Sequence, residues 1–366
     1  MHIVYLVDQT YKSGGIERVL SAKVNYLLSE RSDIQVTIVT NSQHGLPHYF
    51  PLHDRVSAID LDINYDASVS LYSLINIKKA LTHLFRLRSV LKNTLPDIVV
   101  HCGFGFDYFL LPLVARKSKL IKEFHSSRYQ LALRKKKVSE KITDFFEKLY
   151  ATNVFLSSAE QETSVNKNNV IIPNPVPSVQ ISGVISKQKQ VIAAGRITEV
   201  KGFDKLINIW SAIATNYPEW KLKIYGDGDA TYIDELIALS NELGCSDSVD
   251  ILPSTNDIHR HIAEASIYAM SSRTECFPMV LLEAMALKTV VISFDCPTGP
   301  KSVLPIGYHS LITDDDNEKY TETLSELISN SDERDKLIQQ CYLHQKQFTI
   351  DKVMQKWLFL YGAHSD

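Results

Sequence analysis

Val170-Ile-Ile-Pro-Asn-Pro-Val-Pro177 places three prolines within five residues, near the middle of a chain of 366 residues. Proline fixes the backbone angle φ and removes a hydrogen-bond donor, so neither a helix nor a central strand can continue through this stretch. The residues that follow, up to Lys189, are mostly polar and give a core little to bury. A chain of this length suits two domains of about 150–200 residues each. We therefore predict a linker here, between a domain at 1–174 and a second domain at 175–349.

Short β-branched stretches alternate with amphipathic ones on both sides of this linker, which is typical of β-α-β units with a parallel sheet. In the first half, strands are predicted at 3–7, 35–39, 98–101, 119–123 and 153–156, and helices at 17–30, 74–95 and 138–150. In the second half, strands at 190–194, 220–225, 248–252, 267–271 and 289–294 are interleaved with helices at 203–215, 232–243, 257–265 and 278–286.

A last helical pattern at 350–361 places Val353, Trp357 and Leu360 on one face. We expect this helix to cross back and pack on the first domain, which would then include 350–366. The predicted fold class is α/β, with two Rossmann-like domains facing each other across a cleft at the carboxyl ends of both sheets.

The composition excludes several classes of protein. Apolar residues make up 45% of the chain and charged residues 22%, as in soluble globular proteins. No stretch approaches the roughly 20 apolar residues needed to cross a bilayer, and 1–7 lacks the basic leader of a signal peptide. The five cysteines are scattered and never form a CxxC pair, which favours a reducing cytosol over disulfides or a zinc site.

Charge is distributed unevenly along the chain. Residues 116–148 hold eleven basic and four acidic residues, including Arg134-Lys-Lys-Lys137, with Tyr129, Leu131, Leu133, Phe145 and Phe146 among them. Such a cluster is compatible with contact to anionic lipid headgroups, and the alternative is an ordinary solvated helix face. A pI near 6.5 and an acidic second half disfavour nucleic acid as a partner.

The segment Glu275-Cys-Phe-Pro-Met-Val-Leu-Leu-Glu283 follows a predicted strand and opens a predicted helix. Proline suits the first turn of a helix, where the backbone amides lack intrahelical partners and can bind a diphosphate. Each glutamate can accept two hydroxyl hydrogen bonds from a sugar or ribose diol, although two exposed helix acids would look the same. The predicted ligand-binding residues here are Glu275, Cys276, Phe277, Pro278, Met279, Val280, Leu281 and Glu283.

Gly195-Arg196, with Lys201-Gly202 soon after, follows the predicted strand at 190–194. An arginine fork together with a lysine charge is what a diphosphate leaving group needs as its negative charge grows. This spacing is a weak signal alone and gains weight beside the 275–283 segment.

Gly14-Gly15 lies between the first strand and the first helix, where glycine lets the backbone approach a ligand closely. His125 follows the strand at 119–123 and is expected at the carboxyl edge of the sheet, although a lone histidine is more often structural. Neither Gly226-Asp-Gly-Asp229 nor Asp314-Asp-Asp316 is accompanied by other hard ligands, so we interpret both as turns or helix caps and predict no metal.

Taken together, these residues resemble retaining glycosyltransferase family 4, whose members have the GT-B fold. The resemblance covers essentially the whole chain and rests on Gly14-Gly15, His125, Ile172-Pro-Asn-Pro175, Gly195-Arg196, Lys201-Gly202, Gly226-Asp-Gly228 and the Glu275–Glu283 spacing. It implies that Arg196, Lys201 and the helix start hold the diphosphate of a nucleotide-sugar donor near Gly15. It also implies that Glu275 binds sugar hydroxyls, His125 lies near the C6 side of the sugar, and Glu283 binds the ribose.

The resemblance further implies metal-independent transfer without a cofactor and with retention of configuration, in which the leaving phosphate takes the acceptor's proton. Ser293-Phe-Asp-Cys-Pro-Thr-Gly-Pro300 resembles a subgroup associated with bacterial exopolysaccharide, capsule or lipid-linked oligosaccharide synthesis. UDP-linked hexoses or N-acetylhexosamines, a lipid-linked saccharide acceptor and a place at the inner face of the cytoplasmic membrane are implied for that subgroup. Cys276 and Pro278 stand where the family often has glycine, so the sugar contacts there are expected to differ.

Three alternatives remain open at this point. One is another GT-B enzyme, such as a sugar-nucleotide epimerase or a phosphorylase. A second is a nicotinamide-dependent oxidoreductase, which would need a GxGxxG turn where this chain has 9–15. The third is a catalytically inactive partner of another transferase.

Overall fold

Strand β1 (His2–Val7) lies inside the first sheet because its side chains are apolar on both faces. It pairs in parallel with β2 (Gln35–Thr40) and with β4 (Ile98–His101). The seven strands follow the order β3-β2-β1-β4-β5-β6-β7, with β3 at Val56–Asp60, β5 at Lys119–Glu123, β6 at Thr152–Phe155 and β7 at Asn169–Ile171. All six pairs are parallel.

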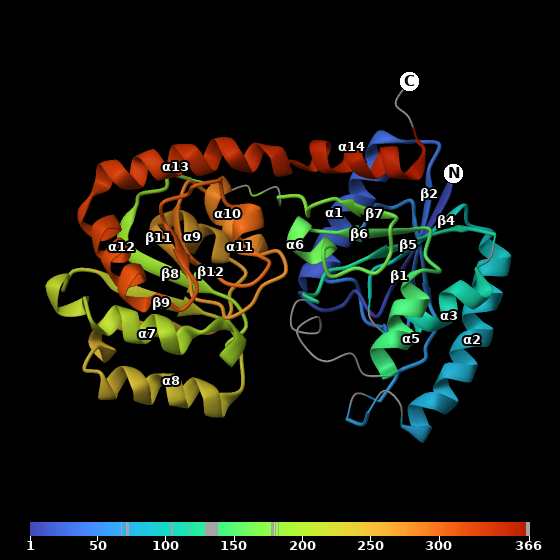
Figure 1. Cartoon of the computed structure of the whole chain (residues 1–366), viewed down its shortest axis with the longest axis horizontal. Coiled ribbons are helices and arrows are strands. Elements are labelled where there is room, and N and C mark those ends of the chain that lie inside the picture. The colour runs from blue at the N-terminus through green and yellow to red at the C-terminus, as the bar shows by residue number, and fades with distance from the viewer. Residues whose placement is uncertain are drawn as a thin grey trace. The chain divides into compact units, whose positions relative to one another are not determined.

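The chain divides into two compact units, Met1–Pro175 with Ile350–Asp366 and Val176–Thr349. The first boundary falls inside the proline-rich stretch quoted above. The structure, a computed structural model, describes residues 1–66, 68–70, 73–103, 105–115, 117–128, 138–176, 179, 181 and 183–363 (Figure 1).

Helices cover both faces of the seven-stranded sheet. On one face, α1 (Gly15–Glu30) and α14 (Ile350–Tyr361) pack on β1 and its neighbours. On the other face lie α2 (Leu74–Thr94) and α3 (Asp107–Val114), and α5 (Val138–Glu147) packs against α3. A short helix, α6 (Ser158–Gln161), precedes β7. Leu20, Val24 and Leu27 form the buried stripe of α1 at helical spacing.

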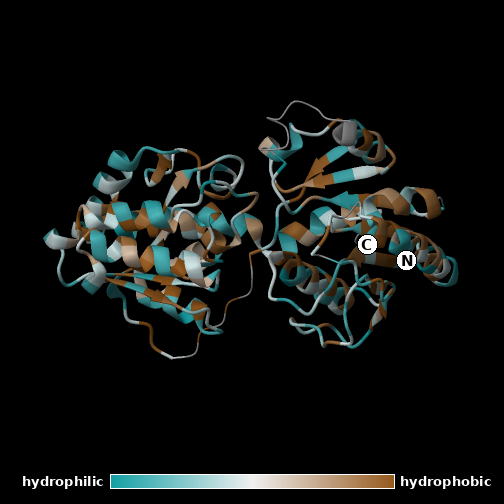
Figure 2. Ribbon diagram, turned by 90° about the horizontal axis from the view of Figure 1, so that it is seen from below, coloured by the Kyte–Doolittle hydropathy of each residue, from teal (hydrophilic) through white to brown (hydrophobic). Residues whose placement is uncertain are grey.

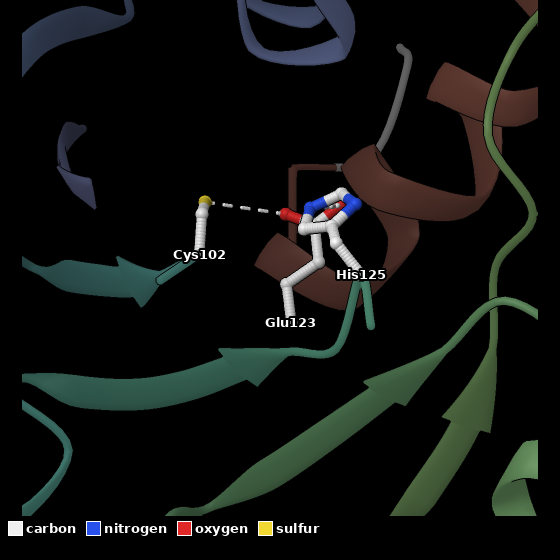
Figure 3. A group of neighbouring side chains, drawn as sticks. All are labelled: Cys102, Glu123 and His125. Carbon is white, nitrogen blue, oxygen red and sulfur yellow. Dashed lines mark hydrogen bonds and ion pairs between the residues drawn. The ribbon is translucent and has the colours of Figure 1, made fainter. Parts of the chain in front are cut away.

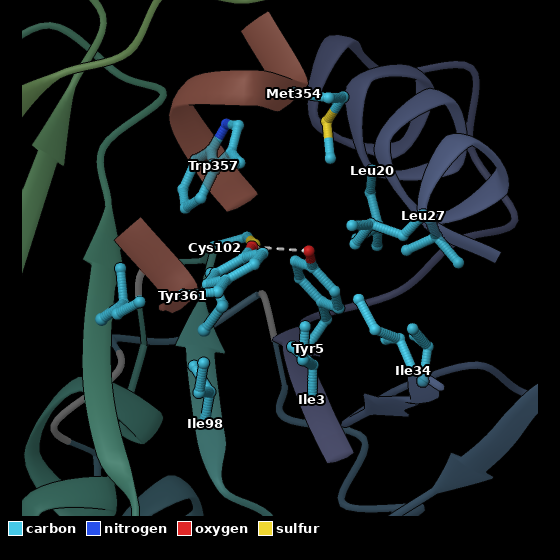
Figure 4. Close-up of a cluster of buried hydrophobic side chains, with 14 of the residues drawn as sticks. Ile3, Tyr5, Leu20, Leu27, Ile34, Ile98, Cys102, Met354, Trp357 and Tyr361 are labelled. Atoms are coloured by element: carbon cyan, nitrogen blue, oxygen red, sulfur yellow. Dashed lines mark hydrogen bonds between the residues drawn. The ribbon is translucent and has the colours of Figure 1, made fainter. Parts of the chain in front are cut away.

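Helix α14 completes the core of the first unit, which confirms the prediction that the last helix returns there. Val353, Met354 and Trp357 are fully buried beside α1. The hydroxyls of Tyr5 and Tyr361 share a hydrogen bond of 2.7 Å in the middle of this cluster (Figure 4).

The second unit is built around a six-stranded parallel sheet in the order β10-β9-β8-β11-β12-β13. Its strands are β8 (Gln188–Ala194), β9 (Lys221–Tyr225), β10 (Val249–Leu252), β11 (Ala265–Met270), β12 (Val290–Asp295) and β13 (Leu311–Thr313). Its helices are α7 (Phe203–Ser211), α8 (Ala230–Glu242), α9 (Ile258–Glu264), α10 (Met279–Ala286), α11 (Pro300–Val303), α12 (Asn317–Ser329) and α13 (Ser331–Gln345). Short 3-10 turns occur at Glu199–Lys201, Ala214–Asn216, Ser246–Ser248 and Lys346–Phe348.

Hydrophobic residues concentrate on the strands, which are largely brown in Figure 2, while many loops and outer helix turns are teal. Both units are therefore Rossmann-like α/β layers, which confirms the predicted class of two Rossmann-like α/β domains. Among the helices that the structure describes, none combines the length and apolar character needed to cross a membrane.

We predict that Trp357→Ala lowers the free energy of unfolding by about 3–5 kcal/mol, because it leaves a cavity between α14 and α1. Phe359→Ala on the same helix is the matched control, since that side chain is 74% exposed. Urea unfolding of both variants measures the difference. Equal stability of the two variants would show that α14 contributes little to the core.

Candidate functional site

The strand order of the second unit reverses at β8. The chain runs from β8 outward to β9 and β10, and then returns to the opposite side of β8 for β11, β12 and β13. The loops after β8 and β11 therefore separate, and open α/β sheets bind ligands at such a point. Arg196 and Lys201 follow β8, and the segment from Glu275 to Glu283 follows β11.

Two glycines fix the turn that carries Arg196, because neighbouring backbones meet there at contact distance. A Cβ atom on Gly226 would lie 1.9 Å from the carbonyl oxygen of Gly195. One on Gly202 would lie 2.2 Å from the carbonyl oxygen of Ser271, at a φ of +63° that favours glycine. Gly202 and Gly226 thus act through close backbone packing, which holds the loops after β8, β9 and β11 together.

The Glu275 carboxylate pairs with Lys201 beside this turn. Lys201 Nζ donates to Glu275 Oε1 at 2.7 Å, and Ser272 Oγ donates to the same oxygen at 2.7 Å. The two charged side chains are 26% and 12% exposed, so a polar ligand can reach them. Behind the pair, Thr298 Oγ1 donates to the Glu275 carbonyl at 2.7 Å and fixes the backbone.

Arg196 is exposed, and the described part of the chain offers its side chain no hydrogen bond or ion pair. Its guanidinium is therefore available to an anion. Sequence reasoning missed the contacts of Ser272 and Thr298 with Glu275. Ser272 belongs to no recognisable motif, and Thr298 lies in the 293–300 run, which gave no hint of this contact.

Helix α10 begins at Met279, so Pro278 is its N-cap residue. The Leu281 amide donates to the Pro278 carbonyl at 3.1 Å. This corrects the prediction that the Leu281 amide is free for a ligand, because the first turn is tightened by a short-range bond. The amides of Met279 and Val280 have no acceptor among the described residues and remain available to an anion.

Two other predicted ligand-binding side chains point into the unit. Phe277 is buried, and its ring packs edge-on against Phe348 at a centroid distance of 5.9 Å. Only its backbone can therefore face a ligand. Cys276, next to it, is half-buried. Glu283 is buried as well, and His259 Nε2 lies 3.0 Å from its Oε2 atom. Reaching a ribose with Glu283 would require competition with His259.

The aspartate clusters have structural partners. Asp229 accepts the Thr231 amide and caps α8, and Asp316 accepts the Lys319 amide and caps α12, as predicted for a cap. Asp227 accepts the Ser254 amide.

In the first unit, Gly14 is the N-cap residue of α1 and Gly15 its first residue. The Glu17 carboxylate folds back over this end, since a Cβ atom on Gly14 would lie 2.0 Å from Glu17 Oε2. An acidic group is favoured beside the free amides of a helix start. Burial nevertheless raises the pKa of Glu17. Glu17 thus occupies the space beside Gly14, whereas the space at Gly15, where the resemblance places the diphosphate, is open.

His125 follows β5 and lies beside the buried carboxylate of Glu123, the last residue of that strand. His125 Nε2 is 3.3 Å from Glu123 Oε1, and the Cys102 thiol donates to Glu123 Oε2 at 3.5 Å. Figure 3 shows Glu123 between these two side chains. Lys23 Nζ donates to both carboxylate oxygens, at 2.7 and 2.8 Å, and lies 3.6 Å from the centre of the Trp357 ring.

Lys23 was missed by sequence reasoning, and its position three residues after Leu20 on the apolar stripe of 17–30 is the signal that could have found it. Lys23 and Glu123 are 1% and 2% exposed. Burial alone would raise the pKa of Glu123, but Lys23 and His125 hold it well below its usual range.

Cys102, Glu123 and His125 offer three potential metal ligands within 4.8 Å of one another. The Lys23 ammonium already neutralises the carboxylate, and burial raises the pKa of the Cys102 thiol, which keeps it protonated. We therefore interpret this cluster as an ion-pair network that orients His125.

This chain is similar to known proteins, in part over the second unit and in part over nearly its whole length. Residues 178–344 match the family described as Glycosyl transferases group 1. An uncharacterized glycosyltransferase of Haemophilus influenzae is 30% identical over 212 residues, which cover 56% of this chain and 59% of that protein. The amylovoran biosynthesis glycosyltransferase AmsD of Erwinia amylovora is 28% identical over 382 residues, covering 97% and 98%. The solved structure of the lipopolysaccharide outer core galactosyltransferase WaaB shares the fold, with a TM-score of 0.73, 18% identity and full coverage of both chains.

We predict that Lys23→Met destabilises the protein by about 3–5 kcal/mol, because it leaves the Glu123 charge buried without a partner. The double variant Lys23→Met/Glu123→Gln removes both charges and should recover most of this loss in urea unfolding. Lys167→Met, at an exposed site of the same unit, is the control.

The same pair predicts a pH dependence. The pKa of Glu123 is lower in the folded protein than in the unfolded chain. Its contribution to the free energy of unfolding is therefore complete at a pH above the unfolded-state pKa, and it is lost as the pH falls through the folded-state pKa. The double variant should therefore lose less stability in acid than the wild type. A double variant as unstable as Lys23→Met would contradict this account of the pair.

Proposed function

We propose that this chain, whose residues 178–344 match the glycosyltransferase group 1 family, transfers a hexose or N-acetylhexosamine from a nucleotide-sugar to a saccharide or lipid-linked saccharide acceptor. The observation that carries the proposal is the partly exposed Lys201–Glu275 pair, which lies in the matched region at the carboxyl ends of β8 and β11 with Arg196 in the adjoining turn. Positive groups for a diphosphate and a carboxylate for sugar hydroxyls are thus contributed by neighbouring loops of one unit.

Arg196, Lys201 and the amides of Met279 and Val280 are proposed to bind the donor diphosphate. Their positive charge compensates the charge that develops on the phosphate as the bond to the sugar breaks. No metal ion is required in this scheme, because the side chains and the α10 start supply that compensation.

Glu275 is proposed to accept hydrogen bonds from sugar hydroxyls. Lys201 and Ser272 donate to its Oε1 atom and so hold the carboxylate in a fixed orientation. Such a fixed acceptor binds a diol without reorganisation during the reaction.

The transfer itself is proposed to retain the configuration of the sugar. The acceptor hydroxyl oxygen bonds to the anomeric carbon on the face that the phosphate leaves, the carbon–phosphate oxygen bond breaks, and the phosphate oxygen takes the hydroxyl proton. This step needs no protein base, and it suits a donor-binding turn in which the Arg196 guanidinium is exposed and Lys201 is paired with Glu275.

The names of AmsD and WaaB indicate synthesis of an exopolysaccharide and of lipopolysaccharide. We therefore propose bacterial surface polysaccharide synthesis as the setting of this reaction. A UDP-linked donor and a place at the inner face of the cytoplasmic membrane follow from the resemblance of 293–300.

Thermal melting with UDP-, GDP- and ADP-sugars tests the donor. One sugar nucleotide should stabilise the protein by about 2.7 kcal/mol at 100 times its dissociation constant, with the same shift in EDTA. NAD serves as the contrasting ligand. Stabilisation by NAD alone would refute the proposal, and conversion of the sugar nucleotide without any acceptor would indicate an epimerase instead.

We also predict that Arg196→Ala lowers kcat for nucleoside diphosphate release by about 100- to 1,000-fold, because its charge acts on the transition state. Its melting temperature should match the wild type, since Arg196 is exposed and unpaired within the described residues. Lys189→Ala, a surface lysine at the opposite end of β8, is the control and should change neither. Loss of stability in proportion to loss of activity would make Arg196 a structural residue.

A further inference from the structure

Helix α2 exposes a stripe of large apolar side chains. Leu74, Leu81 and Phe85 are 79%, 60% and 69% exposed, and Ile77 lies beside them. Their spacing of seven and four residues places the first three on one face of the helix. The opposite face, with Leu87 and Leu91, is buried against the sheet. Exposed apolar residues gathered in this way mark a surface that is covered by something else.

The same helix is strongly basic. Its 21 residues contain five lysines and arginines and no acidic residue. Lys78, Arg88 and Lys92 continue the exposed stripe at helical spacing, and the described residues give none of them a hydrogen bond or ion pair. Arg86, by contrast, donates to the carbonyls of Leu61 and Asp62 and holds the helix to the unit.

We propose that α2 docks on an anionic lipid surface and lies in the plane of the membrane interface. An apolar stripe inserts into the boundary between headgroups and acyl chains, and basic residues along it pair with anionic headgroups. A protein partner could cover the apolar residues, but a stripe with three unpaired cations and no anion matches a lipid surface best.

Helix α5, on the same side of the sheet, supports the proposal. It exposes Ile142 and Phe145, and α3 lies between it and α2 in contact with both (Figure 1). α5 belongs to the basic stretch 116–148, whose sequence is compatible with lipid contact or with a solvated helix face. Residues 129–137 of that stretch lie outside the described residues, so the proposal rests on α2.

This inference does not depend on the proposed transfer reaction, because it is tested without any sugar donor. The full chain is sedimented with vesicles of phosphatidylcholine alone or of an equimolar mixture with phosphatidylglycerol. We expect binding to the anionic vesicles that weakens at high salt. Leu81→Glu/Phe85→Glu should abolish it, and Lys78→Gln/Arg88→Gln/Lys92→Gln should lower the partition coefficient roughly fivefold for each residue replaced.

The matched control is Val184→Glu/Ile306→Glu, which places two acids at the exposed apolar sites of the second unit and should bind as the wild type does. Circular dichroism confirms that each variant is folded. Equal binding by wild type and Leu81→Glu/Phe85→Glu, or no binding of the wild type to anionic vesicles, would overturn the proposal. If the wild type does not bind vesicles but is a dimer, and Leu81→Glu/Phe85→Glu is a monomer, the stripe serves self-association instead.

Discussion

Parallel strands cannot be joined by a tight turn, and every strand pair in both sheets is parallel. The chain must therefore leave each strand at its carboxyl end and return through a covering segment, usually a helix. At one place in each sheet the strand order reverses, and the loops on either side of it separate. The loops after β8 and β11 carry Arg196, Lys201 and Glu275, so the position of the proposed donor site follows from this constraint on connectivity.

Two lysine–glutamate pairs of similar geometry have different roles because their burial differs. Lys201 and Glu275 are partly exposed, so their attraction is screened and a ligand can compete for either group at small cost. Lys23 and Glu123 are almost completely buried and are surrounded by Trp357 and Tyr5. Separating that pair would strand a charge in the core. The first pair suits binding, and the second suits the rigid placement of His125.

The sequence is informative where burial and turn chemistry act locally. β1 and β8 contain apolar runs that end at polar or glycine residues, and they were predictable for that reason. β3 lies at a sheet edge with half-exposed side chains, and β7 has three residues, so neither has a recognisable pattern. The site residues in the turn after β8 were predictable from their glycines. The position of Lys23 on the apolar stripe of α1 hints at its burial, but its partner is a carboxylate 100 residues away and leaves no local signal. The packing of Phe277 on Phe348 likewise depends on a distant segment.

The return of α14 to the first unit has a consequence for synthesis on the ribosome. The strands of the first sheet emerge early, yet Trp357 and Tyr361, which cover Lys23 and Tyr5, are translated only after the whole second unit. Until then, one face of the first sheet lacks its last covering helix, even though domains tend to fold in the order in which they emerge. The nascent first unit must persist with that apolar face open while the second unit is made, so its closure waits for a segment that lies 175 residues further along the chain.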